Sequence, residues 1–253
     1  DIMDLANLEK MNELRARIEA LVEDPNTSEA LKPWYRMFCK RPCFHDEYLQ
    51  TFNRDNVTLV DTEGQGVERI TESGVVVAGV EYPVDCIVYA TGFEVGTGFQ
   101  RVSGFEIYGR DGLSLSDKWS DGIRTLHGMH IHGFPNCFLM STIQGGFTVN
   151  YPHMLDEVAT HVAHIVGHAL AIEKEVVETS AEAEASWVQT ILDKGVRGGI
   201  IGDETCTPGY YNNEGKPREH FEQMVSYGDG PIPFFNLLAK WRDTGDFAGL
   251  TID

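Results

Sequence analysis

The sequence predicts an α/β fold that carries a small antiparallel β-meander and added helices. Residues 84–89 are mostly apolar and β-branched, as in a strand buried on both faces of a parallel sheet. Residues 67–82 alternate with a period of two, which is typical of short antiparallel strands. In residues 1–24 apolar side chains recur at three- and four-residue spacing, which predicts an amphipathic helix.

Local signals place the remaining elements. Asp24-Pro25-Asn26 ends the first helix, and Thr27 or Ser28 is expected to cap a second helix through Leu31. Pro152 suits the first turn of a long helix. Apolar periodicity and turn residues then set the other bounds. We expect strands at residues 57–61, 67–70, 75–77, 80–82, 86–89 and 137–140, and helices at residues 45–52, 152–172, 181–193 and 234–241.

The strand predicted at residues 86–89 ends in three small residues, Ala90, Thr91 and Gly92. Small residues let the backbone approach a ligand closely, and cofactors of α/β proteins bind at the carboxyl ends of the strands. The pattern therefore predicts a cofactor-contacting strand end without naming the cofactor. The alternative is a tight turn within a core.

The composition excludes several classes of partner. The 253 residues contain 39 acidic and 20 basic side chains, a formal net charge of −19. Nucleic acids and anionic membranes select basic surfaces, so neither is expected as a partner. The acidic stretch at residues 173–184 is expected to be a solvated helix face. Five cysteines without framework spacing predict a reducing cytoplasm.

Four motifs, taken in order, resemble one family. They are Cys-Lys-Arg-Pro-Cys-Phe-His-Asp-Glu-Tyr-Leu from Cys39, Asp-Cys-Ile-Val-Tyr-Ala-Thr-Gly-Phe from Asp85, Gly-Phe-Pro-Asn-Cys-Phe-Leu-Met from Gly133 and Thr-Cys-Thr-Pro-Gly-Tyr-Tyr-Asn-Asn-Glu-Gly from Thr205. Together they are similar to the carboxyl-terminal half of Baeyer–Villiger monooxygenases, which are flavoproteins with two Rossmann-like dinucleotide-binding domains. The resemblance implies FAD and NADPH as cofactors, with a ketone and O₂ as substrates.

Three signatures of that family do not occur in the sequence: two Gly-x-Gly-x-x-Gly fingerprints and Phe-x-Gly-x-x-x-His-x-x-x-Trp. We therefore expect the second half of a larger protein, which needs the amino-terminal half to hold FAD. The predicted organisation is residues 1–62 as a helical segment with the end of the NADP-binding domain, 63–172 as part of the FAD-binding domain, and 173–253 as a helical and loop region.

Arg41 is the predicted catalytic residue. A permanently charged guanidinium can stabilise negative charge that develops on oxygen beside a flavin. The resemblance also implies that Arg41 contacts the nicotinamide and that Lys40 approaches the 2′-phosphate of NADPH. The alternative is an ordinary basic pair on a surface connector.

Other candidate cofactor contacts lie on strand ends and loops. By resemblance, Ala90, Thr91 and Gly92 run beside the FAD. The loop at residues 141–150 precedes a helix and faces the flavin, with Gln144, Gly145, Gly146 and Phe147 as its candidates. Tyr210 is the candidate for seating NADP, in place of the Trp that the family often has there. The alternatives are a glycine-containing loop and a self-packed surface loop.

Six histidines have spacings that invite a metal interpretation: His127, His130, His132, His161, His164 and His168. No carboxylate or cysteine completes a zinc set with them, so we expect packed or solvated histidines. Cys39 and Cys43 have the wrong spacing for a disulfide reductase.

The sequence thus predicts the carboxyl-terminal half of an FAD- and NADPH-dependent monooxygenase that inserts one oxygen atom of O₂ into a ketone, giving an ester or lactone. On its own this half is expected to be inactive. Two alternatives stay open: a heteroatom-oxidising or N-hydroxylating flavin monooxygenase, and a non-catalytic accessory fragment. The expected location is the cytoplasm, and neither a nucleic acid nor a membrane is expected as a partner.

Overall fold

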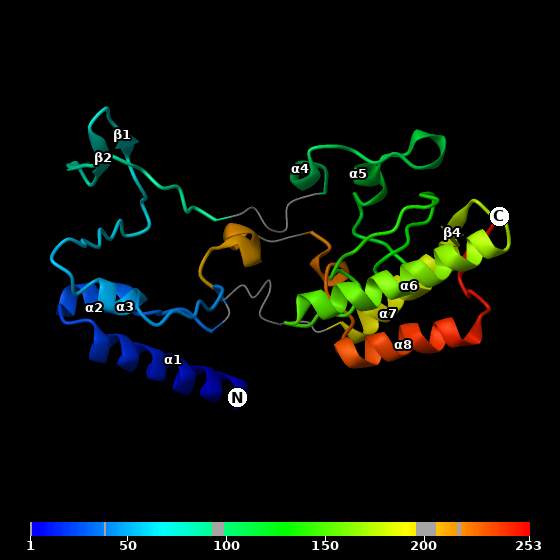
Figure 1. Ribbon diagram of the computed structural model, residues 1–253, viewed down its shortest axis with the longest axis horizontal. Helices are drawn as coiled ribbons and strands as arrows, with labels where there is room; N and C mark the ends of the chain where they lie inside the picture. The colour runs from blue at the N-terminus through cyan, green and yellow to red at the C-terminus, as the bar shows by residue number, and fades with distance from the viewer. Residues whose placement is uncertain (1, 38, 93–98, 196–205, 217–218) are drawn as a thin grey trace. The chain divides into compact units, whose positions relative to one another are not determined.

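The computed structural model describes residues 2–37, 39–92, 99–195, 206–216 and 219–253. Two compact units emerge from it. The first contains the described residues up to 92 together with 206–215, and the second contains 99–195, 216 and 219–253. Figure 1 shows that the long helices α6, α7 and α8 all belong to the second unit. The three-part organisation drawn from the sequence concerns a longer enzyme and stays a prediction.

The first unit begins with two helices, α1 (Ile2–Leu21) and α2 (Pro25–Leu31), and a short third one, α3 (Tyr48–Thr51). All three were predicted from the sequence. The cap of α2 differs, because the Asp24 carboxylate accepts a hydrogen bond from the Thr27 backbone N–H at 2.7 Å. Asp24 is therefore the N-cap, since it lies before Pro25, which suits the first helical position.

The apolar stripe of α1 is only partly covered. Met11 and Ile18 are buried, with 3% and 7% of their surface exposed. Leu5 and Leu8 lie on the same stripe nearer the start of the helix and are 66% and 53% exposed. The periodicity thus correctly predicts the helix, but the described residues of this chain cover only the half of its apolar face toward the carboxyl end.

The predicted meander is present as an antiparallel sheet of three strands in the order β1 (Arg69–Ile70), β2 (Gly74–Val77) and β3 (Val80–Pro83). Val75 pairs with Tyr82 across the second hairpin. Its turn, Ala78-Gly79, has positive φ at both positions, the geometry that matches the twist of two-residue hairpins. Glycine is required at position 74, because a Cβ there would lie 2.1 Å from the Tyr82 carbonyl oxygen.

The strands predicted at 57–61 and 86–89 are wrong for the described chain, which has no regular secondary structure at those residues. Val88 and Tyr89 are 83% and 72% exposed. A parallel strand exists only when its N–H and C=O groups bond to neighbouring strands. No described residue pairs with this segment, so an apolar sequence alone does not form the strand.

The second unit is built on α6 (Tyr151–Ala171), α7 (Ala181–Lys194) and α8 (Pro231–Thr244), all three predicted. Asn150 caps α6, and Pro152 occupies its first turn as expected. A two-stranded antiparallel sheet joins β4 (Val177–Thr179) to β5 (Leu250–Ile252). The strand predicted at 137–140 is reduced to one bridge, between His130 and Phe138.

Short elements complete the second unit and the 206–215 segment. They are α4 (Phe99–Ser103), η1 (Arg110–Gly112), α5 (Leu115–Lys118), η2 (Tyr210–Gly215) and η3 (Phe221–Gln223). The main core of the second unit gathers apolar side chains from the three long helices, including Met154, Trp187, Ile191, Phe234 and Leu238. This core supports the loops that precede α6 and α8.

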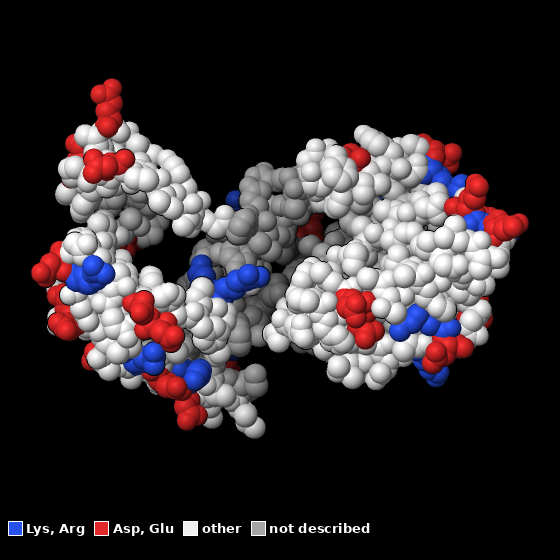
Figure 2. Space-filling model, viewed as in Figure 1, with Lys and Arg blue, Asp and Glu red and all other residues white. Residues whose placement is uncertain are grey.

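The visible surface carries charges of both signs. Figure 2 shows acidic groups interspersed with basic ones and separated by wide uncharged areas. Within the described residues, none of the helices has the length and apolar character needed to cross a membrane.

Candidate functional site

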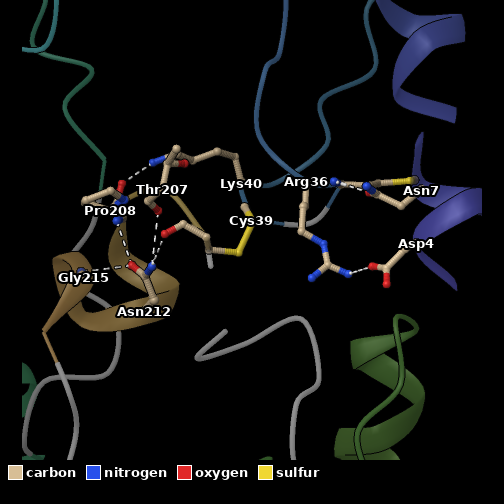
Figure 3. Close-up of a disulfide and its surroundings, with 12 residues drawn as sticks. Asp4, Asn7, Arg36, Cys39, Lys40, Thr207, Pro208, Asn212 and Gly215 are labelled. Carbon is tan, nitrogen blue, oxygen red and sulfur yellow. Dashed lines mark hydrogen bonds and ion pairs between the residues drawn. A yellow bond between two sulfur atoms is a disulfide. The ribbon is translucent and has the colours of Figure 1, made fainter. Parts of the chain in front are cut away.

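Lys40 and Arg41 lie in the first unit, and the 206–215 segment contacts both of them. Figure 3 shows Lys40 beside Pro208. Lys40 Nζ donates a hydrogen bond to the Pro208 carbonyl oxygen at 2.5 Å. Arg41 Nε donates to the Tyr211 hydroxyl at 3.1 Å. A disulfide between Cys39 and Cys206 joins the same two stretches of chain across 167 positions. The site around Arg41 is therefore assembled from residues far apart in the sequence.

The 206–215 segment, which we name the clamp loop, is organised around Asn212. Its side-chain oxygen accepts hydrogen bonds from the Gly209 and Gly215 backbone N–H groups at 2.9 and 3.2 Å. Its side-chain nitrogen donates to the Cys206 carbonyl oxygen at 3.0 Å. With 9% of its surface exposed, Asn212 fixes the loop from inside. Tyr210 begins η2, but its side chain lies outside what the structure describes.

Ala90, Thr91 and Gly92, the predicted strand end, are exposed in the first unit. Gly92 has a φ of 90°, a conformation that favours glycine, and a Cβ there would meet no atom within 4 Å. Backbone geometry rather than crowding therefore requires glycine at this position. The role of these three residues beside FAD stays a prediction.

The predicted cofactor loop, residues 141–150, lies in the second unit, and its Gln144 is fully buried, with 0% of its surface exposed. Its Oε1 accepts hydrogen bonds from the Thr125 N–H and hydroxyl at 3.1 and 2.7 Å. Its Nε2 donates to the carbonyl oxygens of Ile123 and Gln223 at 2.6 and 2.9 Å. The side-chain amide of Gln144 thus links its own loop to residues 123–125 and to residue 223 in the interior of the second unit.

The backbone of the same loop is anchored to the helices. The Gln144 carbonyl oxygen accepts a hydrogen bond from Trp187 Nε1 on α7 at 2.9 Å. Glycine is needed at position 146, because a Cβ there would lie 2.7 Å from the Phe234 ring on α8. Phe147, the last candidate, is 45% exposed. The loop therefore offers Phe147 and backbone groups to a ligand, while Gln144 faces inward.

A cavity of about 780 Å³ adjoins this loop within the second unit. Its lining is mainly apolar, and Met140, Ser141 and Ile143 bring the loop into its wall. Trp119 and Met224 also line the cavity. A cavity of this size and lining suits an apolar molecule with one or two polar atoms.

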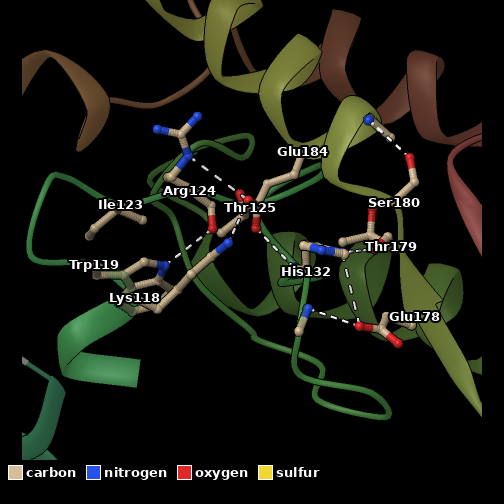
Figure 4. A network of polar contacts seen from close by, with 12 residues as sticks. Lys118, Trp119, Ile123, Arg124, Thr125, His132, Glu178, Thr179, Ser180 and Glu184 are labelled. Atoms are coloured by element: carbon tan, nitrogen blue, oxygen red, sulfur yellow. Dashed lines mark hydrogen bonds and ion pairs between the residues drawn. The ribbon is translucent and has the colours of Figure 1, made fainter. Parts of the chain in front are cut away.

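A buried acidic residue organises the chain beside the loop (Figure 4). Glu184 on α7 is 3% exposed and pairs with Lys118 Nζ at 2.9 Å. It also accepts a hydrogen bond from the His132 N–H at 2.9 Å. The expectation that residues 173–184 form a solvated face is therefore wrong for Glu184. Its position on the stripe of Trp187, three residues on, was the missed signal.

Three histidines of the second unit form a buried cluster. The His161 ring centroid lies 5.8 Å from that of His127 and 6.2 Å from that of His130. Burial lowers the pKa of His127 to about 3, that of His130 to about 4 and that of His161 to about 2, and neighbouring positive charge adds to the effect at His127 and His161. Among the described residues no group of three or more His, Cys, Asp or Glu is arranged to hold a metal ion.

Two features of the site escaped the sequence analysis. Tyr211, which the sequence did not single out, contacts Arg41. The cysteine count predicts a reducing compartment, where disulfides are rare, yet Cys39 and Cys206 are bonded. Nothing in the sequence pairs two cysteines so far apart, although both lie in motifs of the same family.

No protein-family model matches the chain. Among curated proteins, it is 51% identical to a neopentalenolactone D synthase of Streptomyces avermitilis over 252 residues. That match covers 99% of this chain and 42% of the relative. It is 46% identical to a Baeyer–Villiger monooxygenase of Stachybotrys chlorohalonatus, with 99% of this chain and 40% of the relative covered. The chain thus spans about two fifths of the length of these relatives.

Solved structures agree. A polycyclic ketone monooxygenase of Thermothelomyces thermophila superposes with a TM-score of 0.88 at 38% identity, covering 98% of this chain and 40% of that one. A steroid monooxygenase bound to NADP gives 0.81 at 27% identity, covering 98% and 45%. The predicted α/β flavoprotein fold class is therefore confirmed. By sequence and by fold, this chain corresponds to the carboxyl-terminal part of Baeyer–Villiger monooxygenases.

Proposed function

We propose that this chain supplies the carboxyl-terminal part of an FAD- and NADPH-dependent monooxygenase that converts a ketone into an ester or lactone. The overall reaction consumes ketone, O₂, NADPH and one proton, and yields ester, NADP⁺ and water. One observation carries the proposal: the similarity to ketone-oxidising enzymes extends over 98% of the chain at a TM-score of 0.88.

The donor groups suit NADP. Lys40 and Arg41 present two cationic side chains next to one another, and phosphate binds to such groups. We propose that Lys40 meets the 2′-phosphate and that Arg41 and Tyr210 meet the rest of the dinucleotide. The fit to FAD is partial, because the sequence lacks a glycine-rich fingerprint that would cradle a pyrophosphate. This chain then contributes only contacts at the flavin's rim.

FAD, when bound, supplies the redox chemistry that delivers electrons from NADPH to O₂. Arg41 holds a charge that is not lost at any physiological pH, so it stabilises negative oxygen throughout the reaction. The hydrogen bond from its Nε to Tyr211 orients the guanidinium.

The second unit supplies the substrate side of the site. We propose that the loop of residues 141–150 borders the flavin through Gly145, Gly146 and Phe147, and that the adjoining cavity receives the ketone. Gln144 acts by position, because both ends of its amide are bonded to protein atoms. Ala90, Thr91 and Gly92 are proposed to contact FAD from the first unit.

The remaining partner is an amino-terminal portion such as the relatives possess. The exposed apolar segment at residues 84–89 supports this, because no described residue supplies the neighbouring strands that such a sequence favours, and Val88 and Tyr89 are exposed. We propose that this portion completes the sheet and brings both phosphate-binding turns. The expected cytoplasmic location stays a prediction.

The test combines this chain with an amino-terminal portion of relative-like length in one polypeptide. We expect yellow protein with bound FAD and NADPH oxidation that depends on ketone, with a product one oxygen atom heavier. Arg41→Ala should lower kcat about 100-fold while FAD stays bound, as expected for loss of a charge that acts on the transition state. Exposed Arg54, changed to Ala, is the matched control and should leave kcat unchanged.

Three outcomes would contradict the proposal. Product formation from a thioether but from no ketone would identify a heteroatom-oxidising enzyme. Failure of the joined protein to bind FAD would favour an accessory module. Full activity of Arg41→Ala would remove Arg41 from the catalytic site and leave the family assignment intact.

A further inference from the structure

Three contacts fasten the clamp loop to residues 39–41, and one of them is covalent. Figure 3 shows the disulfide and the contact of Lys40 with Pro208. The disulfide attaches Cys206, the first described residue of the loop, to Cys39. The hydrogen bond from Lys40 Nζ holds Pro208, and the one from Arg41 Nε holds Tyr211. Each of three consecutive residues thus contacts the same loop.

The geometry of the loop makes the disulfide the most durable of these contacts. A Cβ on Gly209 would lie 2.7 Å from Lys40 Nζ, so the loop backbone approaches the ammonium group closely. Cys39 is 3% exposed, whereas Lys40 and Arg41 are accessible to solvent. Hydrogen bonds between solvent-accessible groups exchange readily with water and contribute little to stability. The buried cross-link does not exchange.

The opposite side of the basic pair is also fixed. Arg36 Nη2 lies 2.6 Å from Asp4 Oδ1 on α1, and the Met37 N–H donates to Asn7 Oδ1 at 2.8 Å. The segment between α2 and α3, which carries Cys39, is the connector. It is therefore bonded to α1, while the clamp loop is bonded to the connector. An intact disulfide makes α1, the connector and the loop one assembly around Lys40 and Arg41.

We propose that Cys39 and Cys206 are positioning residues whose disulfide pre-organises Lys40, Arg41 and the clamp loop for binding the dinucleotide, so that its reduction weakens binding of NADPH. This inference rests on the proposed function, in which Lys40 and Arg41 bind that cofactor. A ligand that meets an ordered loop does not bear the entropic cost of ordering it. The charge of Arg41 is present in both redox states, so the disulfide acts mainly on affinity, and the chemical step changes little.

Reduction follows ordinary thiol–disulfide exchange with a dithiol. One thiolate of the dithiol attacks a sulfur of the disulfide, and its second thiolate resolves the mixed disulfide. Cys39 and Cys206 take up two electrons and two protons and become thiols, while the dithiol is oxidised to its own disulfide. Exchange with oxidised glutathione reverses the change.

The experiment uses the joined enzyme with bound FAD, in oxidised form and after treatment with dithiothreitol. Intact mass under denaturing conditions, after alkylation of free thiols, reports the state of the pair. We expect the Kd for NADP⁺ and the KM for NADPH to rise about three- to tenfold on reduction, with kcat at saturating NADPH unchanged within about twofold. Re-oxidation with glutathione disulfide should restore the affinity.

Variants separate this role from folding. The double change Cys39→Ser and Cys206→Ser should give the reduced affinity under both conditions. Cys43→Ser removes an exposed thiol four positions away and should behave as wild type. If the double variant fails to fold, the reversible titration of the wild-type enzyme decides alone.

Two results would overturn the inference: equal NADP⁺ affinity of the oxidised and reduced forms, or alkylation of both cysteines in the oxidised enzyme. In either case NADPH oxidation by the enzyme would leave the proposed function standing. Absence of NADP⁺ binding in both forms would instead refute the assignment of Lys40 and Arg41, and the disulfide proposal would fall with it.

Discussion

Two stretches with similar sequences have different fates in this structure. Residues 86–92 and 137–146 each contain a short apolar run followed by small residues and glycine. The first is exposed and without strand pairing, and Tyr89 is 72% exposed. The second ends in a loop whose Gln144 is fully buried and bonded to two other segments, around residues 123 and 223. An apolar run followed by glycine therefore becomes buried only where other segments pack on it, and among the described residues the second unit supplies such segments.

Acidification should have the largest effect, and it should act on the second unit. The folded-state pKa values of His127, His130 and His161 lie at about 3, 4 and 2, below the ordinary value of 6.5. The unfolded chain then binds more protons, so stability is full above pH 6.5 and falls as pH drops toward 4. Each histidine should lower the free energy of unfolding by about 1.4 kcal/mol per pH unit in that window.

Urea unfolding between pH 7.5 and 5 measures this effect. His161→Leu should flatten the pH dependence by about one third, since one of three buried imidazoles is removed. Fluorescence of Trp34, in the first unit, serves as a control against the signals of Trp187 and Trp241. An unfolding free energy that does not change over this range would contradict the buried cluster.

The buried ion pair between Glu184 and Lys118 should give the next largest effect. Glu184→Gln leaves Lys118, whose side chain is 16% exposed, without its carboxylate. Removing one partner of a buried pair should lower the free energy of unfolding by about 3–5 kcal/mol. Glu182→Gln on the exposed face of α7 is the control and should change it by less than about 0.5 kcal/mol. Equal effects of the two changes would refute the buried network.

One substitution in residues 137–146 and one in residues 86–92 test whether the two stretches differ in their contribution to stability. Gln144→Ala removes four side-chain hydrogen bonds and leaves buried partners unsatisfied, so it should cost about 2–4 kcal/mol. Val88→Ser, at a side chain that is 83% exposed, should cost less than about 0.5 kcal/mol in this chain. Chemical denaturation of both variants decides.

The same two measurements, repeated with an amino-terminal portion present, test whether residues 86–89 become buried in the longer protein. If the portion completes the sheet around residues 86–89, Val88→Ser should then cost about 1–2 kcal/mol, because the side chain has become buried. A cost that stays near zero would show that this segment remains exposed in the longer protein. The effect of Gln144→Ala should not change.

The sequence correctly predicted the elements whose signals are local. α1, α6, α7 and α8 follow from apolar periodicity and caps, and the meander follows from alternation and the turn at Ala78-Gly79. Each requires only residues that are close in the chain. The family also followed from the sequence, because several long motifs occur in one order.

The site depended on contacts between distant residues. The sequence singled out Lys40, Arg41 and Gln144, but their surroundings come from the clamp loop and from segments around residues 123 and 223. The sequence around Gln144 would be the same whether its side chain faced a cofactor or a backbone carbonyl oxygen. A polar side chain takes its role from the groups that meet it, and those are set by packing.

The sequence alone thus determined the helices, the meander, the α/β class and the family, since periodicity, turn chemistry and ordered motifs are properties of neighbouring residues. Tertiary structure alone decided that Cys39 joins Cys206, that Glu184 is buried and that Val88 lies exposed. The physical reason is that disulfide pairing and side-chain burial depend on which distant segments pack together, and the order of residues along the chain does not specify this.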